Sequence, residues 1–194
     1  MQEIWKQAAA ETILGDVQLR HIPGFHAVVL TTRGSYRELA HSFARLKAWA
    51  AQVGVDAIAN AVGVFYDHPP AVQPGDCRYS LCLPTSKPES ELARTALAEA
   101  ARDRSSSGPP ASSPLAEGDV VEVREFPRIL AAVTFYRGPV ADSAVAYEQV
   151  AAWVRERPYL LASAPREVYL AQPGLFGPDF MEVEIHQPVL PRGR

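Results

Sequence analysis

Hydrophobic and polar positions change their spacing in the same order twice along this chain. In each block, two short runs of strand-forming residues come first, then a stretch with apolar residues at helical spacing, then two more strand-like runs. In the first block the predicted strands are 17–22, 25–32, 61–66 and 77–83, and in the second they are 121–126, 129–136, 165–170 and 181–187. The pattern therefore predicts ββαββ, twice, in an α+β fold.

The helical stretches carry matching apolar stripes. Leu39, Phe43, Leu46 and Ala50 fall three or four residues apart, so they share one helix face. Tyr147, Val150 and Val154 repeat this spacing in the second block, and each helix has a tryptophan beside the stripe, Trp49 or Trp153. A core position is the safer expectation for both tryptophans, although a ligand-contacting wall is an alternative.

A single offset of 104 residues relates the two blocks without a gap. Residues 17–84 lie over 121–188 with 14 identical pairs among 68. The identities include prolines, a glycine and a tryptophan, and because Gly and Pro restrict or release the backbone, their agreement indicates matched turns. We therefore expect one domain over 1–194, with half-repeats 15–84 and 119–190.

Residues 85–118 separate the two half-repeats. The part 89–104 is rich in alanine and predicts a short surface helix, and the following SSSGPPASSPLAEGD is typical of a flexible connection. A tether without further function is the favoured interpretation of this insert. A helix is also expected over 3–14, with no role assigned.

Composition and charge exclude several classes of protein. The 194 residues are 47% hydrophobic and carry a net charge of −3 without a basic block, which argues against direct nucleic-acid binding. No apolar run is long enough to span a bilayer, and the first residues do not form a secretory signal, so a cytoplasmic protein is expected. Cys77 and Cys82 point to opposite faces of one predicted strand, which favours two reduced thiols and gives no metal-ligand spacing.

One acidic residue stands out on an otherwise apolar strand, APREVYLA (164–171). Glu167 and Tyr169 are two residues apart and share a face of the predicted sheet. An acid beside an aromatic ring suits a cationic or polarisable ligand, and a solvated strand face is the alternative. The repeat sets Glu167 over Gly63 and Tyr169 over Phe65, so a carboxylate is matched by an empty position. This asymmetry predicts a charge with room beside it, between two aromatic rings.

The motifs of this chain resemble those of the GyrI-like small-molecule-binding domain, which also forms the effector-binding half of AraC-type and MerR-type multidrug regulators. They are the strand–Arg-Gly–helix junctions at 33–34 and 137–138, GVFYDHPPAVQPGDCRYSLCLP (63–84), PREVYLAQP (165–173) and EIHQP (184–188). The resemblance covers about 15–190 apart from the insert. It implies a tandem ββαββ (SHS2-like) fold, with two helices on one side of an antiparallel sheet. It also implies a ligand cleft on the other side, along the pseudo-two-fold axis.

The resemblance also implies which residues line this cleft. It places the family's pocket glutamate on Glu167, and with Tyr169, Phe65 and Trp153 this predicts the ligand-binding wall. Tyr66 is a further ligand-binding candidate, and because its side chain points to the opposite face of the strand, packing on the helix is the alternative. Glu184 and His186 take positions that often line the cleft rim. Because an aromatic residue is usual where His186 stands, this departure puts the apolar character of the rim in doubt.

Glu182, Glu184 and His186 share one face of the last predicted strand. Such a row suits a metal or acid–base site, but a solvated strand face is the more common case. With no second cluster of His or Cys, no metal and no cofactor are expected.

Two functions from different classes remain. The first is a stand-alone binder that sequesters or senses amphipathic, including cationic, aromatic small molecules, with no DNA-reading domain of its own. The second, implied by stand-alone family members, is hydrolysis of the reactive cyclopropane of DNA-alkylating natural products, with Glu167 positioning or deprotonating water. The sequence does not decide whether the protein is an enzyme. An adaptor whose cleft binds a partner protein is a third alternative.

Overall fold

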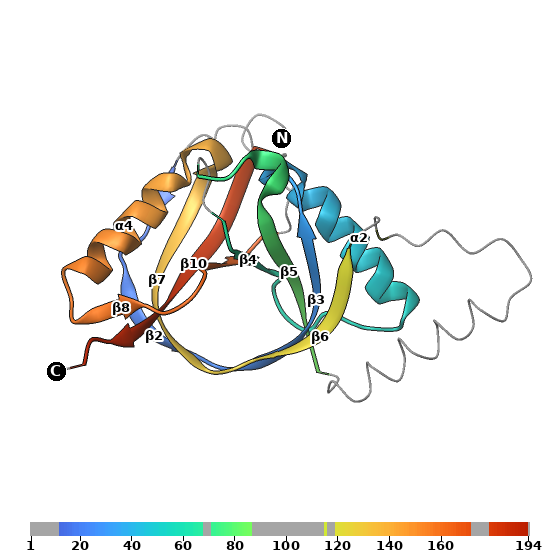
Figure 1. Ribbon diagram of the computed structural model, residues 1–194, viewed down its shortest axis with the longest axis horizontal. Coiled ribbons are helices and arrows are strands. Elements are labelled where there is room, and N and C mark those ends of the chain that lie inside the picture. The colour runs from blue at the N-terminus through green and yellow to red at the C-terminus, as the bar shows by residue number, and fades with distance from the viewer. Residues whose placement is uncertain (1–11, 68–70, 87–114, 116–118, 172–178, 194) are drawn as a thin grey trace, which may run out of the picture. The chain divides into compact units, whose positions relative to one another are not determined.

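The computed structural model describes residues 12–67, 71–86, 115, 119–171 and 179–193. Within these ranges the chain forms ten strands, all paired antiparallel, and two α-helices (Figure 1). The strands are β1 (Ile13–Leu14), β2 (Gln18–Ile22), β3 (Phe25–Arg33), β4 (Val62–Phe65), β5 (Arg78–Thr85), β6 (Val120–Phe126), β7 (Ile129–Pro139), β8 (Tyr159–Leu161), β9 (Arg166–Tyr169) and β10 (Phe180–Pro191). The helices are α2 (Leu39–Gln52) and α4 (Ala144–Arg155), preceded by the 3-10 turns η1 (Tyr36–Glu38) and η3 (Val140–Asp142), with η2 at Pro74–Asp76.

The predicted α+β class and its repeat are confirmed by the order of these elements. Adding 104 to the bounds of β4 gives those of β9, and adding 104 to those of η1 gives those of η3. α2, β3 and β5 likewise map onto α4, β7 and β10 to within a few residues at either end. The structure adds the short strands β1 and β8, which lack the length for a periodic signal. The helices expected over 3–14 and 89–104 lie almost wholly outside the described residues.

The chain divides into two compact units that do not coincide with the two halves of the sequence. Unit 1 contains 1–23, 62–66 and 128–194, and unit 2 contains 24–61 and 67–127. β2 of the first half-repeat pairs with β7 of the second, while β6 of the second pairs with β3 of the first. The two half-repeats have therefore exchanged their first strands.

Unit 2 holds the antiparallel strands β5–β3–β6 with α2 packed against them. Phe43, Leu46 and Ala50, from the predicted stripe of α2, are buried. Leu39 of that stripe is only partly buried.

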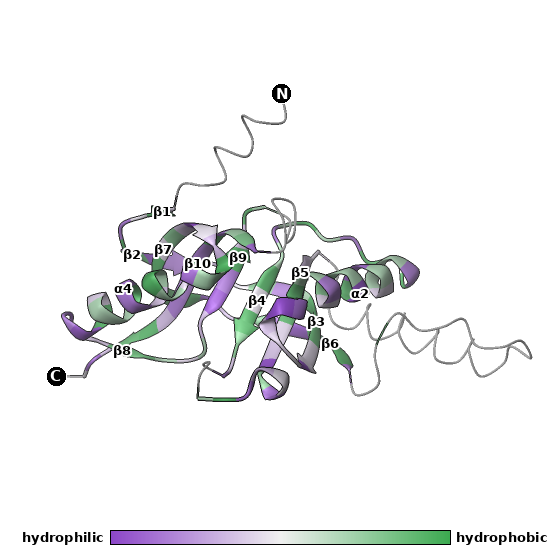
Figure 2. Ribbon diagram, turned by 90° about the horizontal axis from the view of Figure 1, so that it is seen from above, coloured by the Kyte–Doolittle hydropathy of each residue, from purple (hydrophilic) through white to green (hydrophobic). Residues whose placement is uncertain are grey.

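Unit 1 holds the sheet on which the candidate site lies. β7 pairs with β10 on one side and with β1 and β2 on the other; β10 continues to β9, and β9 to β4. The short β8 pairs with the end of β10. α4 lies along β7 (Figure 1), and Val150 and Val154 pack with Ala132 and Val189. β4 is apolar along its whole length (Figure 2) and buried at all four positions.

Two further expectations can be compared with the structure. Cys77 and Cys82 are both buried and are not joined in a disulfide. Among the described residues, no helix has the length and hydropathy needed to cross a lipid bilayer.

Candidate functional site

The strand register of unit 1 brings Glu167 into a row with two neighbours on the same sheet face. Glu167 is paired with Gly63 of β4 on one side and with Ile185 of β10 on the other. Because side chains alternate along a strand, Tyr169 and Phe65 point to this same face. The predicted grouping of Glu167, Tyr169 and Phe65 on one face is therefore what the register gives.

Two tyrosine hydroxyls hold the carboxylate of Glu167. Tyr169 Oη donates to Glu167 Oε2 at 2.6 Å, and Tyr147 Oη, from α4, donates to Glu167 Oε1 in a short hydrogen bond. Tyr147 belongs to the apolar stripe of α4, so the helix that covers the sheet also delivers the second donor. The sequence predicts Tyr147 as a core residue only, and its hydroxyl is the part of this site that was missed.

This contact corrects the expected side of the sheet. The resemblance implied a cleft on the side away from the helices, with Glu167 lining it. Since Tyr147 reaches Glu167 from α4, Glu167 lies on the face that this helix covers. Thr134, which is paired with Ile185 and so shares this face, also meets α4 by donating to Gln149 Oε1 at 3.2 Å.

Glu167 is 5% exposed, and burial raises the pKa of its carboxyl group. The hydrogen bonds from Tyr147 and Tyr169 stabilise the charged form and offset part of this effect. Among the described residues, Glu167 forms no ion pair. The site thus holds a buried acid whose negative charge is met by two neutral donors.

The room expected beside Glu167 is occupied, so that expectation is wrong in this structure. A Cβ atom added to Gly63 would lie 2.9 Å from Cε2 and Cζ of Phe65 and 3.4 Å from Cε2 of Tyr169. The Phe65 ring therefore fills the space that the glycine leaves open. Phe65 is itself 8% exposed.

Glu167 and its two hydrogen-bond donors, Tyr147 and Tyr169, form an acid cluster, and all three residues differ between the repeats. Glu167, Tyr147 and Tyr169 of the second half-repeat correspond to Gly63, Phe43 and Phe65 of the first. The carboxylate and both of its hydroxyl donors are present in one half and missing in the other. This comparison was open to sequence reasoning, and it is the signal by which Tyr147 could have been found.

Glu184 and His186 lie on the opposite face of the sheet, so grouping them in one cleft with Glu167 is wrong. Ile185 faces the same way as Glu167, and its two neighbours in β10 must point to the other side. There Glu184 Oε1 accepts a hydrogen bond from Arg20 Nη1 at 2.7 Å, and Glu184 Oε2 lies 2.9 Å from His186 Nε2. Arg166 is paired with His186 across the strands and is also buried.

Burial and neighbouring charges shift the pKa values of both Glu184 and His186. Burial lowers the pKa of His186, which is 5% exposed, and the hydrogen bond to Glu184 offsets part of that effect. Burial acts to raise the pKa of Glu184, but the hydrogen bonds from His186 and Arg20 outweigh it and lower the pKa. No group of three or more metal-binding side chains occurs among the described residues.

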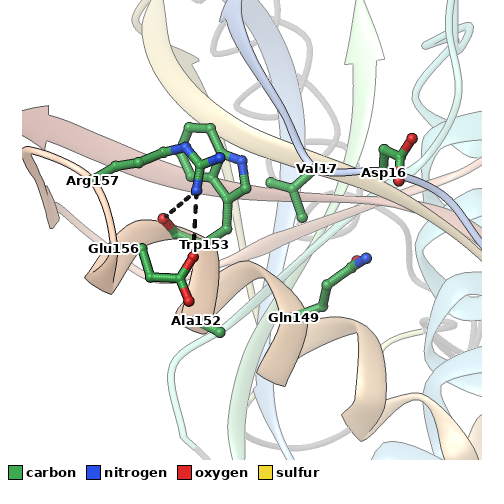
Figure 3. A pocket seen from close by; sticks show the side chains of 7 residues that line it. All are labelled: Asp16, Val17, Gln149, Ala152, Trp153, Glu156 and Arg157. Atoms are coloured by element: carbon green, nitrogen blue, oxygen red, sulfur yellow. Dashed lines mark hydrogen bonds and ion pairs between the residues drawn. The ribbon is translucent and has the colours of Figure 1, made fainter.

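Trp153 and Tyr66 lie outside the acid cluster. Trp153 stacks on Tyr159 with ring centroids 6.1 Å apart, and the Arg157 guanidinium lies 4.1 Å from the centroid of its ring. Trp153 lines a surface hollow of about 400 Å³ that Glu167 does not reach (Figure 3). Tyr66 follows β4 and is 40% exposed.

The hollow at Trp153 and the buried acid are thus separate features. Asp16 and Gln149 line one part of the hollow, and Glu156 and Arg157 line another (Figure 3). It is open and formed by exposed and partly buried side chains, whereas Glu167 is enclosed. The buried chemistry, rather than the hollow, marks the stronger candidate site.

The model of the GyrI-like small-molecule-binding domain matches residues 15–189. This chain belongs to that family. No curated protein sequence matches it significantly.

Solved structures agree at the level of the fold. The C-terminal domain of EcmrR matches with a TM-score of 0.65 and 16% identity, covering 92% of this chain and 99% of that one. A hydrolase from Listeria innocua matches with a TM-score of 0.61 and 12% identity, covering 97% of both chains. SAV2435 bound to tetraphenylphosphonium matches with a TM-score of 0.50 and 13% identity, covering 90% of this chain and 94% of that one.

Proposed function

We propose that this GyrI-like domain binds lipophilic organic cations, with Glu167 as the charge that selects them. The observation that carries this proposal is a buried carboxylate held by Tyr147 and Tyr169, without an ion pair among the described residues. An enclosed negative charge is unfavourable, and a cation brought beside it relieves that cost. The aromatic ring of Tyr169 adds apolar and cation–π contacts of about 0.5–2 kcal/mol.

The family and one structural neighbour support this ligand class. The family is defined by small-molecule binding, and SAV2435 is a relative in fold that is bound to tetraphenylphosphonium, a lipophilic cation. Neutral tyrosine donors leave the net charge of the cluster at −1 when Glu167 is ionised. A lysine or arginine at either tyrosine position would cancel the charge that we propose the ligand meets.

Isothermal titration calorimetry with tetraphenylphosphonium tests the proposal on the wild type and on Glu167→Gln. The glutamine keeps the size and a hydrogen-bond acceptor but removes the charge, so we expect at least tenfold weaker binding, about 1.4 kcal/mol. Glu148→Gln, on the exposed side of α4, is the matched control and should bind as the wild type does. Equal affinity of Glu167→Gln and the wild type would reject Glu167 as the selecting charge.

Proton release gives an independent readout of the same site. Burial raises the pKa of Glu167 and a bound cation lowers it, so at a pH near the folded-state pKa cation binding should release a proton. The calorimetric enthalpy should therefore depend on the ionisation enthalpy of the buffer in the wild type. That dependence should vanish in Glu167→Gln.

Hydrolysis is the second candidate function, and the same residue favours it. A buried acid with a raised pKa between two hydroxyls can accept a proton from water or return one to a leaving group. The hydrolase from Listeria innocua is a neighbour in fold. Mass spectrometry of an electrophilic cyclopropane compound after incubation separates the two functions: a gain of one water indicates hydrolysis, and an unchanged mass indicates binding alone.

A further inference from the structure

The ring of Phe65 lies where a ligand at Glu167 would have to go. Gly63 is paired directly with Glu167, and directly opposed positions of an antiparallel pair have side-chain attachment points about 4.5–5.5 Å apart. The Cβ position of Gly63 lies 2.9 Å from two atoms of the Phe65 ring. A phenyl ring of the protein itself therefore fills the space next to the buried carboxylate.

We propose that Phe65 occupies the ligand's own aryl subsite, and that the site takes cations whose charge lies one or two bonds from a phenyl-sized ring. The inference rests on the proposed function and narrows its ligand class. The ligand's ring replaces that of Phe65 on the backbone of Gly63 and the edge of Tyr169. Its cationic centre then comes beside the carboxylate of Glu167.

The ring of Phe65 can leave without breaking a side-chain hydrogen bond to the buried carboxylate. Moving Tyr147 or Tyr169 removes a hydrogen bond to a buried carboxylate, and such bonds to charged groups contribute about 1.5–3 kcal/mol. A phenyl ring has no polar group to lose. Phe65 also stands at the end of β4, the last residue before the strand stops.

Gly63 makes the exchange possible because it has no side chain. A ring resting on a glycine backbone can be replaced by another flat ring without a change in the strand. Any larger residue at 63 would fill the space permanently, since its Cβ already falls within 2.9 Å of ring atoms. The glycine thus keeps a ring-shaped space that either Phe65 or a ligand fills.

Calorimetry with three probes tests this inference on the wild type, Phe65→Ala and Phe65→Leu. Phenyltrimethylammonium has the ring and the charge, tert-butylbenzene is its neutral isostere, and tetramethylammonium has the charge without the ring. Removing the Phe65 ring should tighten phenyltrimethylammonium binding about tenfold, because no fraction of the protein is then held in the Phe65-filled state that cannot bind the ligand. Phe65→Leu is the milder variant, and near-UV and far-UV circular dichroism checks that both variants are folded.

The controls separate this exchange from the creation of an ordinary cavity. A void that merely accepts rings would bind tert-butylbenzene with the same gain as phenyltrimethylammonium, and that outcome overturns the proposal. An unchanged affinity for phenyltrimethylammonium in both variants overturns it as well. Tetramethylammonium should gain less than the aryl cation, because it cannot fill the ring space.

Adding Glu167→Gln makes failure of this inference distinguishable from failure of the proposed function. If Glu167→Gln binds aryl cations as tightly as the wild type, the proposed function fails, whatever Phe65 does. If Glu167→Gln weakens binding but the Phe65 variants do not strengthen it, only the aryl subsite is rejected. The gain in Phe65→Ala should be lost in the Phe65→Ala/Glu167→Gln double variant.

Discussion

Gly63 and Glu167 occupy equivalent positions in the two repeats and are also paired directly with each other across β4 and β9. In the same ladder Val62 is paired with Val168, the repeat equivalent of Val64, and Val64 is paired with Arg166, the repeat equivalent of Val62. A local two-fold axis of this strand pair therefore passes between Gly63 and Glu167. The repeat is broken at its own axis, where one side has a buried acid and the other has no side chain.

Gly63→Ala should destabilise the protein through Phe65. The added methyl group would lie 2.9 Å from two ring atoms, and overpacking of this kind costs about 1–3 kcal/mol. Urea unfolding followed by circular dichroism measures this change. Phe65→Ala in the same chain should recover part of the loss, while Gly75→Ala, where nothing lies within 4 Å, should have little effect. Equal stabilities of the two alanine variants would contradict the contact.

Gly63→Glu should be less stable than Gly63→Gln at neutral pH. Either side chain must displace Phe65, but the glutamate also places a second carboxylate directly opposite Glu167, where like charges repel. The difference between the two variants should shrink as the pH falls toward 4, because protonation removes the repulsion.

Glu167→Gln should raise the unfolding free energy at pH 7–8. Burial raises the folded-state pKa of Glu167 above its usual 4.5, so the native state binds more protons than the unfolded state between these two values. Wild-type stability contributed by this group is present below about pH 4.5 and is lost as pH rises through the folded pKa. The gain from the variant should therefore be near zero at pH 4 and largest at high pH, in urea titrations across this range. A gain that does not depend on pH would contradict a buried charge.

Tyr147→Phe and Tyr169→Phe should each lower the free energy of unfolding, because each removes a hydrogen-bond donor from the carboxylate of Glu167. We expect losses of about 1.5–3 kcal/mol above the folded-state pKa of Glu167, the range for hydrogen bonds to charged groups. A double-mutant cycle with Glu167→Gln measures the coupling. Tyr159→Phe, whose ring stacks on Trp153, serves as the control and should show no coupling to Glu167. Absence of coupling for Tyr147 would show that the helix does not hold the acid.

His186 should titrate below its usual pKa of 6.5, since burial disfavours its charged form. Glu184→Gln should lower this pKa further, because the carboxylate is the group that favours the charged imidazole. Proton-detected NMR titration measures both values, and His186→Gln assigns the resonance. The same burial means that acid destabilises the fold: as pH falls below 6.5 the unfolded state gains a proton that native His186 resists. A higher pKa in Glu184→Gln would contradict the hydrogen bond.

The sequence predicted most of the fold because its signals are periodic and repeated. The spacing of apolar residues predicts strands and helices in the same order in both half-repeats, which are related by the offset of 104 residues. It predicts eight strands and two helices at nearly their observed bounds. The exchange of β2 and β6 between the two half-repeats was not accessible in this way, because periodicity does not say which strand pairs with which. Strand alternation likewise placed Glu167, Tyr169 and Phe65 on one face.

Contacts that depend on tertiary packing could be predicted only in part. The spacing of Tyr147 on its helix correctly indicates an inward-facing residue, but not that its hydroxyl meets a carboxylate on β9. The space beside Gly63 follows from the sequence, whereas its occupation by Phe65 depends on a side-chain rotamer. The separation of Glu184 from Glu167 follows from strand register, which the isolated strands do not specify.

Asp119 in unit 2 should contribute more to the stability of the fold than Glu122, an exposed acidic residue on β6. Its carboxylate accepts from Arg45 Nη1 at 2.6 Å and from Thr32 Oγ1 at 2.8 Å, and the side chain is 2% exposed. Asp119→Ala would leave the 16% exposed Arg45 guanidinium without this partner, and breaking a buried pair costs about 3–5 kcal/mol.

The matched control is Glu122→Ala, whose ion pair with Arg124 is exposed on both sides and should be worth about 0–1 kcal/mol. Both variants are compared by urea unfolding at low and high salt. The double variant Arg45→Met/Asp119→Ala should recover much of the loss, because no buried charge is left unpaired. At 1 M salt the Debye length is about 3 Å, which screens solvent-exposed ion pairs but not buried ones. The Arg45–Asp119 pair would therefore behave as a solvent-exposed pair if Asp119→Ala cost no more than Glu122→Ala, or if 1 M salt removed the effect of Asp119→Ala.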